Sequence, residues 1–96
     1  MSPLKRKKLS KIRSELDKLD NSLIKLIKIR TNLVKNVLKL KENKNQIVDQ
    51  KRIKTILINI RKKSLKNKID PKITNRIWKN MIWTYIDFER RNFKKK

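Results

Sequence analysis

Apolar residues recur at alternating intervals of three and four through the first 40 residues, and this pattern constrains the fold more than any other feature. It is a heptad seam, typical of a helix that packs along one side. No glycine or proline interrupts the chain from Leu4 to Asn43, so we expect one helix of about 38 residues and roughly 60 Å. The apolar seam positions are Leu9, Ile12, Leu16, Leu19, Leu23, Leu26, Leu33, Val37 and Leu40.

Two shorter helices are expected to follow this long one. The polar segment 42–46 ends the heptad pattern and predicts a loop. Asp49 is a favourable N-cap for a second helix, and Asp70 followed by Pro71 is a strong start signal for a third. A chain of 96 residues is too short to cover so long a helix by itself. We therefore expect an all-α fold, in which a three-helix protomer with a long N-terminal helix forms an intertwined homodimeric helical bundle.

Composition limits the domain organisation and the chemistry. Residues 1–96 are expected to form a single domain, with basic ends at 1–8 and 92–96 that fray. The chain has no cysteine and no histidine, which excludes thiolate ligands and a histidine base, so we expect no metal and no cofactor. No apolar run is long enough to span a membrane, and none follows the basic N-terminus, so a cytoplasmic location is expected.

The net charge of +22 is typical of proteins that bind nucleic acid. Lysine, isoleucine and asparagine dominate the sequence, however, and alanine and glycine are absent. An A/T-rich coding sequence would give this bias whatever the protein did. A basic helical nucleic-acid-binding module therefore stays as an alternative function, and nucleic acid is not the partner that we expect.

One arginine interrupts the apolar seam. Arg30 lies between Leu26 and Leu33, where a desolvated guanidinium needs an anionic partner. Lys41 follows 11 residues later, about 20° from the same face and roughly 16 Å along the helix axis. Two long cationic side chains on one face suit a small anion. Arg13 lies about 100° around the helix from Arg30, so it could serve the site of a neighbouring chain.

The later helices add a carboxylate and a further cation. Arg52 lies in the first turn of the second helix. In the third helix a row of residues steps by four along one face, so its last member, Glu89, should be partly buried. No nucleophile and base are paired in the sequence, and the set suits electrostatic stabilisation of a small anion better than acid–base hydrolysis. The row consists of Ile77, Met81, Tyr85 and Glu89.

These residues carry a resemblance to a known family. The segments 12–20 and 23–30, with Leu33, Val34 and Lys41, resemble the first helix of the all-helical chorismate mutases. The resemblance continues through 49–52 and 69–71 to Glu89 and covers about residues 9 to 90. It implies a homodimer with two equivalent sites, each promoting the Claisen rearrangement of chorismate, a dicarboxylate, to prephenate in aromatic amino-acid biosynthesis. Such an enzyme is an isomerase that needs no cofactor.

The resemblance also implies a role for each site residue. Arg30 would bind one carboxylate of the substrate, and Arg13 of the other protomer would bind the second. Lys41 would donate a hydrogen bond to the ether oxygen as its C–O bond breaks, and Glu89 would face the same oxygen. Only the protonated form of Glu89 can donate such a bond. The remaining expected substrate-binding residues are Asp49, Arg52, Ile53, Ile82 and Tyr85.

One position departs from the family pattern. Chorismate mutases usually have a glutamate after the arginine matched by Arg52, where it takes the substrate hydroxyl, and this chain has Ile53. The isochorismate-pyruvate lyases share the fold and the cationic set and carry an apolar residue there. The tryptophan-containing segment 82–86 is also similar to theirs. Isochorismate-pyruvate lyase is therefore the alternative enzymatic function.

Overall fold

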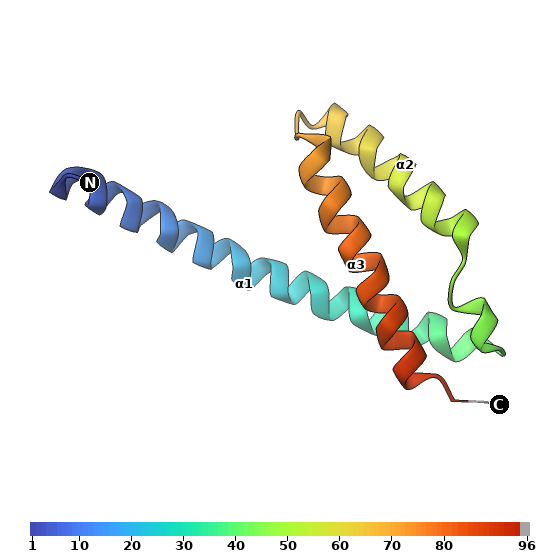
Figure 1. The fold of residues 1–96 in the computed structure, drawn as a ribbon. Helices are drawn as coiled ribbons and strands as arrows, with labels where there is room; N and C mark the ends of the chain where they lie inside the picture. Colours follow the sequence, from blue (N-terminus) through green and yellow to red (C-terminus); the bar gives the residue numbers. More distant parts are fainter. Residues whose placement is uncertain (95–96) are drawn as a thin grey trace. The chain divides into compact units, whose positions relative to one another are not determined.

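The computed structural model describes residues 1–94 and is helical almost throughout (Figure 1). No residue in this range lies in a strand. The all-α class, the long first helix and the two shorter helices are therefore confirmed. The elements are α1 (Pro3–Leu40), the short 3-10 helix η1 (Lys44–Gln46), α2 (Gln50–Lys66) and α3 (Pro71–Asn92).

Helix α1 has the expected 38 residues. It begins at Pro3, whose fixed φ suits a first helical position, and the Ser2 hydroxyl oxygen accepts a hydrogen bond from the Lys5 N–H at 3.2 Å. Most of the basic segment 1–8, expected to fray, is therefore helical. At the other end of the chain α3 runs to Asn92, and residues 95 and 96 of the basic tail lie outside the described part of the chain.

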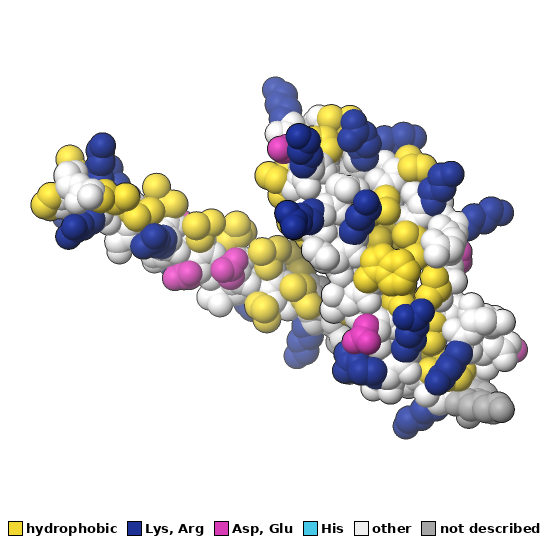
Figure 2. Space-filling view, viewed as in Figure 1, with side chains coloured by type: hydrophobic (Ala, Val, Ile, Leu, Met, Phe, Trp, Pro, Cys, Tyr) yellow, Lys and Arg dark blue, Asp and Glu magenta, His cyan; other side chains and the backbone are white. Residues whose placement is uncertain are grey.

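The chain divides into two compact units, Met1–Leu33 and Val34–Lys96. The first unit is a single stretch of helix in which no residue is buried. Its heptad residues are largely exposed, with Leu26 at 60%, and apolar side chains follow one another along α1 in Figure 2. A lone helix has nothing against which to bury an apolar seam, so this surface is open to another chain.

The second unit has a small apolar core built between α2 and α3, which run in opposite directions (Figure 1). The core consists of Ile47, which directly follows η1, with Ile82 and Ile86 of α3. Burying these side chains fixes the segment after α1 against α3. The partly buried residues that pack against this core are Val48, Ile53, Ile56, Leu57 and Phe93.

Local hydrogen bonds set the bounds of α2 and α3. Asp49 caps α2 by accepting a bond from the Arg52 N–H at 3.0 Å, and Asp70 caps α3 by accepting from the Lys72 N–H at 2.9 Å. Both expected helix starts are therefore confirmed. Helix α2 ends in a Schellman motif, in which the Ile69 N–H bonds the carbonyl oxygen of Ser64 at 2.9 Å.

Lys68 takes the left-handed position of that motif, with φ of 56°. Glycine usually fills this position, and this sequence has none. A buried polar contact holds the two helices beside the turn: the Ser64 and Thr74 hydroxyl oxygens lie 2.6 Å apart, and Ser64 also donates to the Ile60 carbonyl. The short α2–α3 connection is thus held by side chains from both helices.

We predict that Ile86→Ala lowers the free energy of unfolding by about 3 kcal/mol, because it removes most of one of the three core side chains and leaves a cavity. Ile58→Ala is the matched control, since Ile58 is 46% exposed on α2, and it should change the free energy by less than about 0.5 kcal/mol. Urea denaturation at one fixed protein concentration measures both. Equal effects would contradict the assignment of the core.

Candidate functional site

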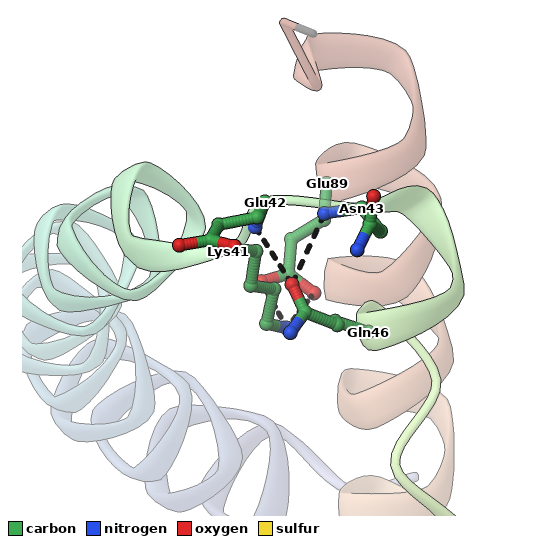
Figure 3. A network of polar contacts seen from close by, with 5 residues as sticks. All are labelled: Lys41, Glu42, Asn43, Gln46 and Glu89. Atoms are coloured by element: carbon green, nitrogen blue, oxygen red, sulfur yellow. Dashed lines mark hydrogen bonds and ion pairs between the residues drawn. The ribbon is translucent and has the colours of Figure 1, made fainter. Parts of the chain in front are cut away.

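The centre of the candidate site is an ion pair between Lys41 and Glu89. The Lys41 Nζ lies 3.0 Å from Glu89 Oε1 and 3.2 Å from Oε2, so the ammonium donates to both carboxylate oxygens (Figure 3). The two side chains are 18% and 7% exposed. Lys41 is the first residue after α1, and Glu89 lies in the last turn but one of α3. The expected burial of Glu89 is confirmed.

Burial explains why these two residues pair. A carboxylate removed from water is costly unless a cation and hydrogen bonds compensate for the lost hydration. Lys41 supplies both, and the bonds are strengthened because each partner is charged. An ammonium held in so dry a place stabilises negative charge on an oxygen more strongly than one in water. The same group could therefore serve a substrate oxygen that becomes negative.

A polar turn holds the backbone next to Lys41. The Gln46 Oε1 accepts hydrogen bonds from the N–H groups of Glu42 and Asn43, at 2.7 and 3.0 Å (Figure 3). The segment 42–46, expected as a loop, thus contains the ordered helix η1. Gln46 is not among the site residues expected from the sequence. A glutamine three residues after an asparagine is half of a capping box, and that signal could have identified it.

An open pocket of about 620 Å³ lies beside Lys41. Leu40, Val48 and Asp49 are among the residues that line it. Asp49 therefore combines the cap of α2 with a place in the lining of the pocket that Lys41 also lines. Arg52, whose N–H binds that cap, has an exposed side chain in the first turn of α2.

The other expected site residues of this unit belong to the apolar packing. Ile82 is buried in the core, and Ile53 packs against that core from α2. Tyr85 lies one turn before Glu89 and is partly buried, and its ring meets Phe88 edge to face at 6.5 Å. That Ile53, Ile82 and Tyr85 contact a substrate stays a prediction.

Two expected carboxylate-binding residues lie in the N-terminal unit. Arg30 is partly buried on α1, and Arg13 is exposed on the same helix. The structure thus brings Lys41 together with Glu89, and sets Asp49 on the adjoining pocket. The substrate-binding roles of Arg13 and Arg30 stay predictions.

Within residues 1–94 no helix is long and apolar enough to cross a membrane. The same residues contain no group of three or more acidic side chains that could hold a metal ion.

We predict strong coupling between Lys41 and Glu89 in a double-mutant cycle. Lys41→Met or Glu89→Leu alone leaves its partner buried and uncompensated, whereas the double variant leaves neither charge, so the coupling free energy should be about 1–3 kcal/mol. The exposed pair Arg91–Asp87 is the matched control, with an N–O distance of 3.0 Å and an expected coupling of about 0.3 kcal/mol. Urea denaturation measures both cycles. Additive effects at Lys41 and Glu89 would refute the burial argument.

Comparison with known proteins identifies the family. The search of curated proteins and the search of solved structures each gave no significant match. The family model described as chorismate mutase type II matches residues 12–90, which is most of the chain. The matched range holds the exposed seam of α1, the Lys41–Glu89 pair and both helix caps. The resemblance found in the sequence is confirmed, and the chain belongs to the chorismate mutase type II family of isomerases.

Proposed function

We propose that this chain converts chorismate to prephenate by electrostatic stabilisation of the rearranging substrate, with Lys41 as its principal catalytic cation. The observation that carries the proposal is the Lys41–Glu89 pair, because both side chains are largely buried and Lys41 lines an open pocket. Family membership supplies the reaction.

The side chains of the proposed site can meet the requirements of the reaction. In the Claisen rearrangement a C–O bond breaks as a C–C bond forms, within one molecule and without proton transfer. The site has to hold the reactive conformer and stabilise the negative charge that builds on the ether oxygen. Lys41 would exchange one carboxylate oxygen of Glu89 for this ether oxygen. A chain without histidine can perform all of these steps.

The two substrate carboxylates require further cations. We assign one carboxylate to Arg30 and the second to Arg13 of the partner subunit, because these two arginines match the pattern of the family's first helix. A guanidinium binds a carboxylate through two parallel hydrogen bonds, which fixes its orientation as well as its charge. Arg52, Asp49, Tyr85, Ile82 and Ile53 complete the proposed substrate-binding set.

The partner is proposed to be a second copy of this chain. Large apolar side chains along α1 are about half exposed or more, and a continuous apolar surface of this kind marks an association site. An identical helix offers the same heptad spacing and can cover it by knobs-into-holes packing. The exposed seam residues include Ile12, Leu16, Leu19, Leu23, Leu26, Leu33 and Val37.

We predict that Arg13→Ala and Arg30→Ala are each folded, dimeric and almost inactive. A mixture of the two, allowed to exchange subunits, should regain about a quarter of the parent activity. Half of the dimers are then mixed, and each mixed dimer has one of two sites intact when Arg13 acts across the interface. Lys28→Ala, on the same helix, is the control and should keep its activity. Failure of the mixture to regain activity, while mass spectrometry shows mixed dimers, would refute the shared site.

Glu89 is proposed to face the ether oxygen together with Lys41. A glutamine side chain keeps the length of Glu89 and carries a neutral N–H donor, whereas leucine has no polar atom. We predict that Glu89→Gln keeps most of the activity with chorismate and that Glu89→Leu loses most of it. Steady-state assays with chorismate measure both variants. Equal activity of the two would exclude the proposed role of Glu89.

The mutase and lyase functions are separated by their products. The mutase converts chorismate to prephenate, whereas the lyase would release pyruvate from isochorismate. Ile53 packs against the core of its own unit, so its apolar side chain has a structural reason that does not depend on the substrate. We expect prephenate from chorismate and no pyruvate from isochorismate. Pyruvate release without mutase activity would overturn the proposal.

A further inference from the structure

The backbone of Lys41 lies where helical hydrogen bonding stops. The Lys41 N–H still bonds the Leu38 carbonyl oxygen at 3.1 Å, but α1 ends at Leu40. The next two N–H groups, those of Glu42 and Asn43, have no place in the helical ladder. The group that binds the N–H groups of Glu42 and Asn43 therefore sets the position of Lys41, the lysine on which the proposed chemistry depends.

Gln46 is the residue that binds this backbone. Its Oε1 accepts from both N–H groups, at 2.7 Å from Glu42 and 3.0 Å from Asn43, and the close view shows the side chain reaching back beside Lys41 (Figure 3). One side-chain oxygen thus closes the turn that follows the catalytic lysine. The Gln46 N–H bonds the Asn43 carbonyl oxygen at 3.1 Å and tightens the same turn.

The turn that Gln46 closes is anchored to α3, the helix that carries Glu89. Gln46 is the last residue of η1, and the next residue, Ile47, is buried with Ile82 and Ile86 of α3. Glu89 lies three residues after Ile86 on α3. A chain of contacts therefore runs from α3 through Ile47 and Gln46 to the backbone beside Lys41. The positions of Lys41 and Glu89 thus both depend on α3.

We propose that Gln46 is a positioning residue for catalysis, which holds the Lys41 ammonium at the place where the ether oxygen of the substrate becomes negative. This inference rests on the proposed function. Gln46 also lines the pocket beside Lys41, but in this role it acts through the position of Lys41. Because the charge on the ether oxygen is largest in the transition state, a displaced Lys41 lowers kcat more than it raises KM.

The test compares three variants of the full chain. Gln46→Met keeps the length of the side chain but removes the acceptor oxygen, and Gln46→Glu keeps an acceptor. Lys44→Gln, at the first position of η1, is the control for altering the turn, since Lys44 is exposed and its side chain makes no hydrogen bond in the described residues. The measurements are kcat and KM for chorismate, and hydrogen exchange of the Glu42 and Asn43 amides by NMR.

We expect Gln46→Met to lower kcat by about tenfold or more with KM changed less than about threefold, because small misplacements of a catalytic group are costly. Its Glu42 and Asn43 amides should exchange faster, whereas Gln46→Glu should restore slow exchange and most of the lost kcat. Lys44→Gln should match the parent.

Two results would overturn the inference. One is a Gln46→Met variant with faster amide exchange and a kcat within about twofold of the parent. The other is a Gln46→Glu variant whose kcat is as low as that of Gln46→Met, although its Glu42 and Asn43 amides exchange slowly. A parent protein without mutase activity would refute the proposed function instead, and the amide exchange would still report whether Gln46 holds the turn.

Discussion

A carboxylate that is almost closed to water keeps its charge only when a cation reaches it, and the pairing of Glu89 with Lys41 meets this requirement. The pair joins the end of α1 to the last part of α3 across 48 positions of sequence. The packing of Ile47 against α3 and the closing of the turn by Gln46 both support it. It also holds the largely buried side chain of Lys41, a residue that lines an open pocket. Structure and proposed chemistry therefore depend on the same interaction.

Helix α1 differs from the Lys41–Glu89 pair in the kind of group it leaves in an unfavourable environment. The pair buries charged groups, whereas α1 exposes apolar side chains to water. Nothing in the N-terminal unit covers the α1 seam. The small core of the C-terminal unit uses Ile47, Ile82 and Ile86. In the proposed homodimer, folding and the assembly of a shared site would be coupled. The placement of Arg13 and Arg30 on this one helix agrees with such an arrangement.

Local features of the fold could be predicted from the sequence. The starts of α2 and α3 follow from Asp49 and from Asp70 with Pro71, because capping depends on neighbours along the chain. The length of α1 follows from the absence of glycine and proline, and the burial of Glu89 follows from its row on α3. These features need no knowledge of how the helices pack.

The features that could not be predicted depend on tertiary contacts. The sequence predicted a loop over 42–46 but not its conformation: α1 stops at Leu40, and the Gln46 side chain binds the N–H groups of Glu42 and Asn43. The direct bond between Lys41 and Glu89 depends on how Ile47 packs the segment after α1 against α3. The hydrophobic periodicity of the sequence does not predict which residues of the two segments lie opposite each other. Ile82 lies in the core and Ile53 packs against it, which was not predicted from the sequence; that the two contact the substrate stays a prediction.

The central claim is that Lys41 leaves Glu89 to serve the ether oxygen of the substrate. A crystal structure of the protein with a dicarboxylate analogue of the transition state tests it most directly. The account predicts the Lys41 Nζ within about 3 Å of the analogue's ether oxygen, with one carboxylate on Arg30 and the other on Arg13 of the partner subunit. An analogue bound elsewhere, with Lys41 still donating both bonds to Glu89, would contradict it.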